Sequence, residues 1–459
     1  MSGGSRAPAA PTAGAPSAAP RSDYDGDPTR LVRHPASLQG GPDHPLYAVW
    51  EITLRCDLGC VHCGSRAGKA RPDELTTAEC FDMVHQLAAL GVREVTLIGG
   101  EAYLRDDWAE IATEVTRSGM TCGMTTGARN LTPERLEQAV KAGIRVISVS
   151  LDGLEATHDA QRGVRGSWRA AVDASRRIAA SPIRLATNTQ INRVSLPELP
   201  ALAQLLAEIG SKAWQIQLSV AMGRAADRPN LLLQPYDLLD LFPLLVWIKE
   251  TTLDPAGVQL FPGNNIGYFS PYEQRLRYGG DRGGHWAGCS AGRYTLGLEA
   301  DGKIKGCPSL PTTEYTGGNI RDMRLADVVA HSRELRVIRE RTVDDLWGFC
   351  RGCYYAETCK GGCTWTSHCL LGRPGNNPYC IHRALELEQQ GLRERVVKVE
   401  AAPGLPFDNG RFEIVVEPMP ETGDTPSLVG VPLADVLALK SSSAGAWTGP
   451  ERADRLTVA

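Results

Sequence analysis

Residues 47–63 of the chain read YAVWEITLRCDLGCVHC. The opening stretch, YAVWEITL, is rich in β-branched and aromatic residues and predicts a buried β-strand. Cys56, Cys60 and Cys63 follow directly, in the spacing C-x3-C-x2-C. A structural zinc site needs a fourth ligand close by, and no further cysteine follows closely. Three thiolates at the end of a strand instead suit an iron–sulfur cluster with one iron left open to a small molecule.

The pattern of a strand followed by a helix continues along the chain. Strands are predicted at 47–54, 94–100, 121–126, 146–151, 183–191 and 214–219, and helices near 76–91, 107–118, 132–142, 167–180, 196–209 and 235–250. Such an alternation predicts an α/β fold with a parallel sheet and right-handed crossovers. In folds of this kind the chemistry lies at the carboxyl ends of the strands, where Cys56, Gly99, Thr126 and Ser150 fall.

A set of polar residues at these strand ends predicts a binding site for an amino acid. Gly99 and Gly100 allow a ligand to approach the backbone closely, and the carboxylate of Glu101 can hold an ammonium group. Ser150 ends the fourth strand, and Arg162 follows in the sequence HDAQRG. A hydroxyl and a guanidinium can together hold a carboxylate. An ammonium site beside a carboxylate site, facing an open iron, would accept an amino-acid group.

Beside the third cysteine, His62 can pack its ring against a nucleobase. The motif CDLGCVHC, the GGE sequence and the six βα units together resemble the radical S-adenosylmethionine (radical SAM) superfamily over about 46–250. This resemblance implies a partial (β/α)6 TIM-type barrel and a 4Fe–4S cluster whose open iron binds SAM. Reductive cleavage of SAM would give methionine and a 5′-deoxyadenosyl radical that abstracts hydrogen from a substrate.

The resemblance also implies a role for each of these residues. It assigns the cluster to Cys56, Cys60 and Cys63, the adenine contact to His62, the SAM amino group to Gly99, Gly100 and Glu101, and the SAM carboxylate to Ser150 and Arg162.

A second group of cysteines lies between residues 289 and 380 and holds eight of the 13 in the chain. In a reducing cytosol, clustered cysteines more often bind metal than form disulfides. Seven of them follow the spacing C-x12-G-x4-C, C-x2-C-x5-C-x3-C and a final C. By spacing alone, they could hold two more iron–sulfur clusters or two zinc ions.

This spacing resembles the SPASM pattern over about 285–385, which implies two auxiliary 4Fe–4S clusters. One would take Cys350, Cys353, Cys359 and Cys380, and the other Cys289, Cys307 and Cys363, with its fourth iron site open. Cys369 lies outside the pattern and is expected to be a spectator or a substitute ligand. Cys80 and Cys122 fall in a predicted helix and strand and are expected in the hydrophobic core.

The bulk properties predict a soluble cytoplasmic protein of several domains. The predicted division is a disordered Ala/Pro-rich tail (1–42), a radical SAM core (43–255), a bridging segment (256–284), a SPASM domain (285–385) and a C-terminal helix and tail (386–459). The charged run CIHRALELEQQGLRERVVK (380–398) is expected to be one helix, and RFEIVVEP (411–418) is expected to be a strand. The net charge of −4 gives no electrostatic reason for a nucleic-acid or anionic-membrane partner. The longest apolar stretch begins at Leu238, is interrupted by Pro243, and is too short to span a bilayer.

The SPASM resemblance implies a substrate class, because relatives with this pattern mostly modify peptides or proteins. Sulfatase-maturating relatives carry an Asp after the cysteine of the G-x4-C element, where this chain has Pro308. The N-terminal tail is too short for the winged-helix module that grips leader peptides in several relatives. The leading hypothesis is a peptide maturase that installs a crosslink or another oxidative modification on a ribosomal peptide. Its partners would be an electron donor such as flavodoxin or ferredoxin and, if needed, a separate leader-recognition protein.

Two other classes of function remain open at this point. One is a radical SAM dehydrogenase or epimerase of a sugar or amino acid, and the other is a non-catalytic iron–sulfur electron carrier. Substrate contacts are expected from Asn265 and Tyr268 in the bridging segment, which otherwise would be a packed interdomain linker. Gln215 and Gln217 lie two residues apart in a strand and therefore share one face, which is expected to be the barrel interior.

Overall fold

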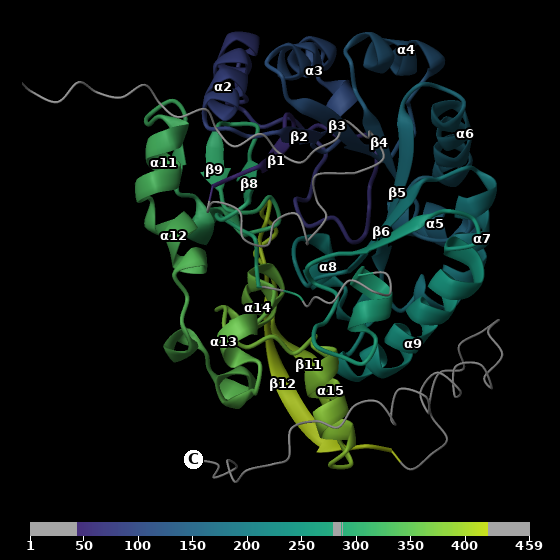
Figure 1. Ribbon diagram of the computed structural model, residues 1–459, viewed down its shortest axis with the longest axis vertical. Helices are drawn as coiled ribbons and strands as arrows, with labels where there is room; N and C mark the ends of the chain where they lie inside the picture. Colours follow the sequence, from purple (N-terminus) through teal and green to yellow (C-terminus); the bar gives the residue numbers. More distant parts are fainter. Residues whose placement is uncertain (1–43, 279–285, 287, 421–459) are drawn as a thin grey trace, which may run out of the picture.

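The computed structural model describes residues 44–278, 286 and 288–420. The predicted tail at 1–42 and the segment after residue 420 therefore lie outside the described residues. One curved sheet dominates the molecule, with the strand order β10-β9-β8-β1-β2-β3-β4-β5-β6-β7. Helices α2, α3, α4, α6 and α7 surround its outer face (Figure 1). The predicted α/β fold is confirmed.

All six predicted strands and the helices between them are present. The strands of the sheet are β1 (Tyr47–Glu51), β2 (Glu94–Ile98), β3 (Thr121–Thr126), β4 (Val146–Ser150), β5 (Arg184–Ile191), β6 (Ala213–Leu218), β7 (Gln259–Pro262), β8 (Thr295–Leu298), β9 (Lys303–Lys305) and β10 (Gly318–Asn319). The helices of this part are α2 (Thr77–Ala89), α3 (Trp108–Arg117), α4 (Pro133–Lys141), α5 (Glu155–Arg162), α6 (Ser167–Ala179), α7 (Leu199–Glu208), α8 (Arg224–Asp227) and α9 (Leu238–Ile248).

The parallel sheet is longer than the sequence predicts. The alternation was expected to stop near residue 255, but β7 pairs in parallel with β6, and β8 pairs in parallel with β1. β9 and β10 then add antiparallel pairs at one edge. Among the described strands, none joins β7 to β10, so the sheet remains an open partial barrel. A four-residue strand such as β7 carries too little periodicity to be predicted from its own sequence.

The core fills the space between the outer face of the sheet and its helices. Helix α2 begins with the predicted capping box of Thr76 and Glu79. Cys80 and Cys122 are buried in this core, as expected. The helical stretch Pro229–Leu253 is long and apolar enough to cross a membrane, but 72% of its apolar window is buried inside the protein. It is a core element of the fold.

The inner face of the sheet is polar. Side chains alternate between the two faces of a strand, and in β4–β6 the outward residues, such as Ile147 and Trp214, are fully buried. The part-exposed inward residues of β5 and β6 are Asn188, Gln190, Gln215 and Gln217. The face shared by Gln215 and Gln217 is thus the inner one. The carboxyl ends of these strands open onto the region where the cysteine loop lies.

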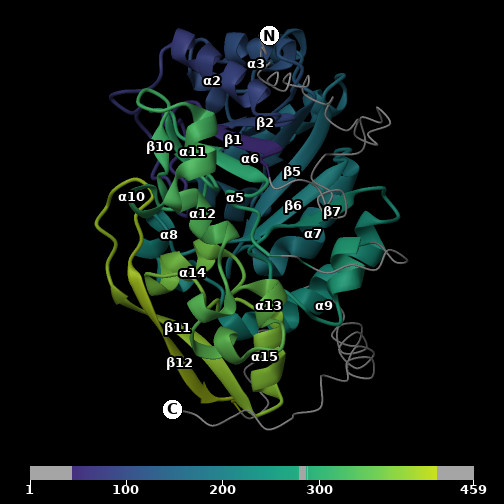
Figure 2. The same cartoon turned by 60° about the vertical axis from the view of Figure 1, so that its left-hand side comes forward.

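The C-terminal third is a loop-rich layer of short elements packed against the barrel (Figure 2). Its helices are α10 (Thr312–Tyr315), α11 (Leu325–His331), α12 (Arg333–Arg339), α13 (Ala356–Cys359), α14 (Thr364–Leu371) and α15 (Ile381–Glu388). A two-stranded hairpin follows, made of β11 (Leu392–Glu400) and β12 (Arg411–Pro418).

One prediction for this region is wrong. The charged segment after residue 380 was expected to be a single helix, but α15 ends at Glu388, and residues 392–400 form β11. Gly391 adopts a positive φ of 70°, which ends the helical conformation. The sequence RERVVKVE then places its valines in a strand that pairs with the confirmed strand β12.

Candidate functional site

The loop that carries Cys56, Cys60 and Cys63 follows β1 and lies on the end of helix α5. The backbone N–H of Val61 donates to Gln161 O at 2.8 Å, and that of Gly59 donates to Arg162 O at 3.0 Å. A side chain on Gly163 would collide with the carbonyl of Gly59, so only glycine allows this close contact. The cysteine loop is therefore fixed against the helix that carries Arg162.

The three thiols lie close together in a buried environment. The pKa of the Cys56 thiol is raised to about 12, mainly by burial and further by Glu101 and the thiols of Cys60 and Cys63. Burial also raises the pKa of Cys60, against the opposing effect of the Arg162 guanidinium. The thiols of Cys56 and Cys60 therefore keep their protons until a metal displaces them. Sequence reasoning brought these cysteines together correctly.

Glu101 is a buried carboxyl group that forms no salt bridge with the described residues, although the Arg162 guanidinium lies near enough to act on it. It is 1% exposed, and burial raises its pKa to about 8. Its Oε2 accepts a hydrogen bond from the backbone N–H of Gly127 at 2.9 Å, whereas Oε1 has no partner in the described structure. A buried carboxylate needs a donor or a cation to be stable. This site is therefore ready to accept an ammonium group.

The glycines before Glu101 are required by packing, and their expected role at the SAM amino group stays a prediction. A Cβ on Gly99 would collide with Thr53 O, and a Cβ on Gly100 would collide with Arg55 O. The backbone N–H of Glu101 donates to Arg55 O at 2.8 Å. The two glycines thus bring the end of β2 against the chain leaving β1, and this packing holds Glu101 beside the cysteine loop.

Asp152 is the residue of this site that sequence reasoning missed. It is fully buried, and its Oδ2 lies 2.6 Å from Arg162 Nη2 and 3.2 Å from His62 Nε2. Burial alone would raise its pKa, but the Arg162 and His62 side chains hold the pKa well below the usual range. Arg162 Nη1 in turn donates to Cys60 Sγ at 3.7 Å. The available signal was an acidic residue two positions after Ser150, at the carboxyl end of β4.

Ser150 lies apart from this ion pair. Its hydroxyl donates to Asn188 Oδ1 at 3.0 Å, on the inner face of the sheet. The structure therefore joins His62 and Arg162 through Asp152 but gives Ser150 a different partner. Their shared role at a carboxylate stays a prediction.

The cysteines of the C-terminal layer form two groups. The first contains Cys350, Cys353, Cys359 and Cys380, and the second contains Cys289, Cys307 and Cys363. In the first, burial raises the pKa of Cys359 well above its usual value, and the other three thiols add to the effect. In the second, burial raises the pKa of Cys363 to about 12, with Cys289 and Cys307 contributing. These are the two sets that the spacing implied.

A single-ion metal site finds no support in the described part of the chain. No three histidine, cysteine, aspartate or glutamate side chains there meet in a geometry that would hold one ion. A zinc ion needs four ligands around one point, whereas a four-iron cluster spreads its thiolates over separate irons. The arrangement of the thiols suits clusters better than zinc.

Two family descriptions match this chain. Residues 50–205 match the radical SAM superfamily, and residues 289–354 match SPASM, an iron–sulfur cluster-binding domain. The chain is a radical SAM protein. As in other members, it is an iron–sulfur enzyme with a SAM-binding 4Fe–4S cluster and auxiliary clusters.

Curated relatives of this radical SAM protein cover most of its length. An AdoMet-dependent heme synthase of Methanosarcina barkeri is 29% identical over 350 residues, which are 74% of this chain and 97% of that protein. The mycofactocin maturase MftC of Mycolicibacterium smegmatis is 29% identical over 362 residues, which are 77% of this chain and 86% of that protein. Sequence identity alone does not separate these two chemistries.

Solved structures share the fold of this radical SAM protein. Streptococcus suis SuiB bound to S-adenosylmethionine superimposes with a TM-score of 0.57 at 19% identity, covering 70% of this chain and 74% of SuiB. Native anSMEcpe with bound AdoMet gives a TM-score of 0.59 at 16% identity, covering 74% of this chain and 96% of anSMEcpe. At these identities the likeness establishes the fold.

The residues present fit the cofactor of a radical SAM protein. Glu101 Oε1, Arg162 Nε and His62 Nδ1 are all buried and have no hydrogen-bond partner among the described residues. A carboxylate, a guanidinium and an imidazole are the groups that an ammonium, a carboxylate and an adenine ring require. Three unpaired polar atoms beside three convergent thiols are therefore consistent with bound SAM.

The two expected substrate contacts in the bridging segment are wrong. Tyr268 is fully buried, its hydroxyl accepts the backbone N–H of Cys363 at 3.0 Å, and its ring stacks on Trp286 at 4.0 Å. Asn265 uses its amide to bond both the N–H and the carbonyl of Leu218, at 3.2 and 2.8 Å. Neither side chain is available to a substrate, because Tyr268 packs against the cysteine layer and Asn265 bonds the bridging segment to β6.

Cys369 is a buried apolar side chain. It is fully buried and packs with Val220, Met222 and Phe407. Burial raises the pKa of its thiol well above the usual value. Cys363 of the second cysteine group also contributes to this shift, so both expected roles of Cys369, spectator and substitute ligand, stay predictions.

Proposed function

We propose that this radical SAM protein abstracts hydrogen from a peptide and installs a crosslink or another oxidative modification. The observation that supports a peptide substrate is the polar inner face of β5 and β6. Gln190 Nε2 donates to Gln217 Oε1 at 3.1 Å, and Asn188 lies in the same row. The amide of Gln215 has no partner among the described side chains. Amide side chains both donate and accept, so they can pair with the N–H and C=O groups of a peptide.

A porphyrin is a less suitable occupant of this face. Heme is a large, flat ring with apolar faces, and such faces pack best against apolar walls. The inward side chains at Asn188, Gln190, Gln215 and Gln217 would lose hydrogen bonds to water against such a ring without replacing them. We therefore favour the maturase over the heme synthase among the two kinds of relative.

Each residue of the proposed SAM-binding site has a proposed role. Cys56, Cys60 and Cys63 hold the SAM-binding cluster, and the carboxylate of Glu101 holds the SAM ammonium group. Ser150 and Arg162 face the SAM carboxylate, and the ring of His62 packs beside the adenine. Gly99 and Gly100 place Glu101 in this SAM-binding site through their contacts with Thr53 and Arg55. Asp152 fixes the orientations of Arg162 and His62.

When bound, the cluster and SAM supply the 5′-deoxyadenosyl radical that removes a hydrogen atom from the substrate. The closed walls of the site exclude water, since Cys60, Glu101, Asp152 and Arg162 are all buried. In the proposal, the seven cysteines of the C-terminal layer hold two auxiliary clusters that accept the electron left on the substrate. An external donor such as flavodoxin or ferredoxin completes the electron path.

The proposed location is the cytoplasm. All thirteen cysteines are free thiols, as expected in a reducing compartment. The proposed division into domains keeps a radical SAM core at 43–255, a bridging segment at 256–284 and a SPASM domain at 285–385. A separate leader-recognition protein remains part of the proposal as an optional partner.

The test compares substrates on anaerobically reconstituted protein supplied with SAM and a reductant. The peptide encoded beside the gene should lose hydrogen masses in a mass spectrum, and 5′-deoxyadenosine should form in proportion. The Cys56→Ala variant should form neither product. Turnover of iron-coproporphyrin, or of a free sugar or amino acid, without any response to the peptide would reject the maturase and leave the small-molecule alternative.

A further inference from the structure

Residues 404–409, which we call the strap, connect β11 to β12 and reach back to the cysteine loop. The backbone N–H of Phe407 donates to Gly64 O at 3.2 Å, directly after Cys63. The N–H of Gly223, in the loop after β6, donates to Asp408 O at 2.7 Å. The strap is thus bonded through its backbone to two loops at the mouth of the barrel. It lies outside both matched family regions, which end at residues 205 and 354.

An ion pair strengthens this junction. Arg66 Nε donates to Asp408 Oδ1 at 2.8 Å, and Arg66 Nη1 donates to Asp227 Oδ2 at 2.7 Å. The side chain of Asp408 is only 6% exposed, so the pair is shielded from solvent. The other carboxylate oxygen of Asp408 accepts the N–H of Leu405 at 2.9 Å, which fixes the shape of the strap itself. One carboxylate therefore joins the strap to the cysteine loop.

The backbone on both sides of this junction is held in an unfavourable conformation. Arg66 has a φ of 48° and Phe407 a φ of 59°, although both carry large side chains. Residues with a Cβ reach the left-handed region only when their surroundings compensate. Arg66 is three residues beyond Cys63, and its N–H donates to the Cys63 carbonyl at 3.4 Å. The contacts of the strap supply part of the stabilisation that offsets this unfavourable backbone conformation.

The ring of Phe407 lies between the barrel and the cysteine layer. It is 8% exposed and packs with Met222 and Cys369. The ammonium of Lys305, in β9, lies 4.1 Å from the centre of the ring, which gives a favourable cation–π contact. A Cβ on Gly64 would meet Met222 at 2.6 Å. The strap, the cysteine loop and the loop after β6 are therefore in direct contact.

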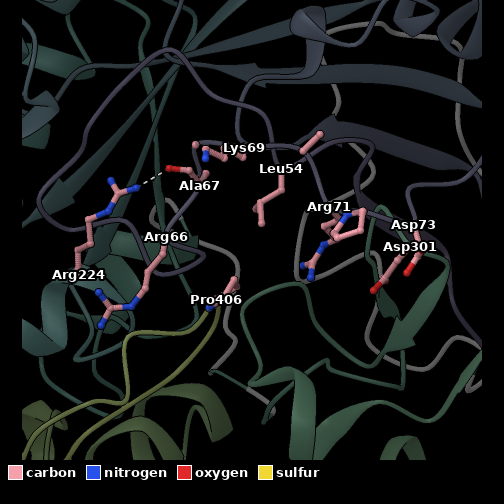
Figure 3. A pocket seen from close by; sticks show the side chains of 12 residues that line it. Leu54, Arg66, Ala67, Lys69, Arg71, Asp73, Arg224, Asp301 and Pro406 are labelled. Carbon is pink, nitrogen blue, oxygen red and sulfur yellow. Dashed lines mark hydrogen bonds between the residues drawn. The ribbon is translucent and has the colours of Figure 1, made fainter.

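A cavity of about 570 Å³ lies on the open side of this junction. Figure 3 shows Arg66 and Arg224 on one side of it, Pro406 of the strap below, and Arg71 on the other side. Arg224 donates to Cys60 O at 2.8 Å, so one wall of the cavity is the outer surface of the cysteine loop. Without the strap, the backbone of residues 64–66 would face this solvent-filled space.

We propose that the strap positions the third cysteine of the SAM-binding cluster. Asp408 holds Arg66, and Phe407 holds the carbonyl of Gly64, so together they fix the chain that follows Cys63. The proposal rests on the assignment of Cys63 as a cluster ligand. It gives Asp408 and Phe407 the role of positioning residues, which act through the cysteine loop and do not contact SAM or substrate.

The experiment measures iron loss from the full-length, cluster-loaded protein exposed anaerobically to a ferrous chelator. Asp408→Asn and Phe407→Leu should each release about a third of the iron roughly tenfold faster than the unmodified protein. The part of the electron paramagnetic resonance signal that changes on adding SAM should disappear at the same rate as this iron is released. The signals of the auxiliary clusters should persist.

Leu405→Ala is the matched control, since it alters the same segment at a side chain that is 63% exposed. It should release iron at the unmodified rate. The proposal fails if Asp408→Asn behaves like Leu405→Ala, or if all three clusters lose iron at the same rate. If Asp408→Asn does not fold, Asp408→Glu keeps the charge, moves the carboxylate by one methylene, and is judged by the same two readouts.

Discussion

Replacing Glu101 with glutamine should weaken SAM binding about ten- to a hundredfold. The structure gives Glu101 one paired oxygen, which accepts the Gly127 N–H, and one buried oxygen without a partner. In our proposal the SAM ammonium group binds that second oxygen. A hydrogen bond between charged groups contributes about 1.5–3 kcal/mol, which corresponds to that range in the dissociation constant. Glutamine preserves the shape and the Gly127 contact but removes the charge.

The same carboxyl group should make SAM binding depend on pH. Its pKa is raised to about 8 by burial, so at pH 7 only about one Glu101 in ten carries a charge before SAM binds. The ammonium group needs the ionised form, so affinity should rise as the pH increases from 6 to 8, and it should fall above pH 8 as the α-amino group of SAM loses its own proton. The glutamine variant should show no such rise.

Stability should change in the opposite direction. Because the folded-state pKa of Glu101 lies above its ordinary value of 4.5, ionisation opposes folding, and the SAM-free protein should lose stability as the pH rises from 4.5 towards 8. Glu101→Gln should lack this loss and melt at a higher temperature than the unmodified protein near pH 8.

Calorimetric titration of SAM into cluster-loaded protein at pH 6, 7 and 8, with thermal melting of the SAM-free samples, measures both effects. An unchanged dissociation constant in the variant, or equal pH profiles for the two proteins, would refute the reasoning.

Three further changes test other parts of the site. Cys380→Ala should remove about four irons per chain, one whole cluster, whereas Cys369→Ala should keep the full iron content, as chemical iron analysis can show. Asp152→Asn leaves the buried Arg162 guanidinium without its counter-charge and should lower the free energy of unfolding by about 3–5 kcal/mol in a denaturant titration; an unchanged midpoint contradicts the ion pair. Gln217→Leu should abolish peptide modification while 5′-deoxyadenosine still forms without peptide. Full modification of the peptide by this variant would show that the polar inner face does not bind the substrate.

Much of the fold could be predicted because its signals are local. The longer strands and helices of the barrel carry their own periodicity, and some helices carry a cap, such as Thr76 with Glu79 before α2. The failures occurred where local signals are short or ambiguous. The four residues of β7 are too few to show a period, and the charged run after Glu388 suited a helix until Gly391 and the pairing with β12 made it a strand.

The candidate site also has a part that could be predicted from the sequence and a part that could not. The resemblance to the SPASM pattern predicted both groups of the C-terminal layer, whereas the spacing alone left the assignment of each cysteine open. The roles of Asn265 and Tyr268 could not be predicted, since a polar side chain in a linker can face a substrate or a neighbouring domain. Only the packing against Leu218 and Cys363 showed that they face the protein.

The sequence by itself determined the radical SAM chemistry, because CDLGCVHC, GGE and the later cysteines are local patterns that carry their own ligand chemistry. Tertiary structure alone decided how those groups are held. Asp152 meets His62 and Arg162 only when the loop after β1 packs on α5. Arg66 and Asp408 are 342 positions apart in the chain, yet they form one buried pair beside Cys63. No local pattern encodes such contacts, since they arise from the packing of elements that are distant in sequence.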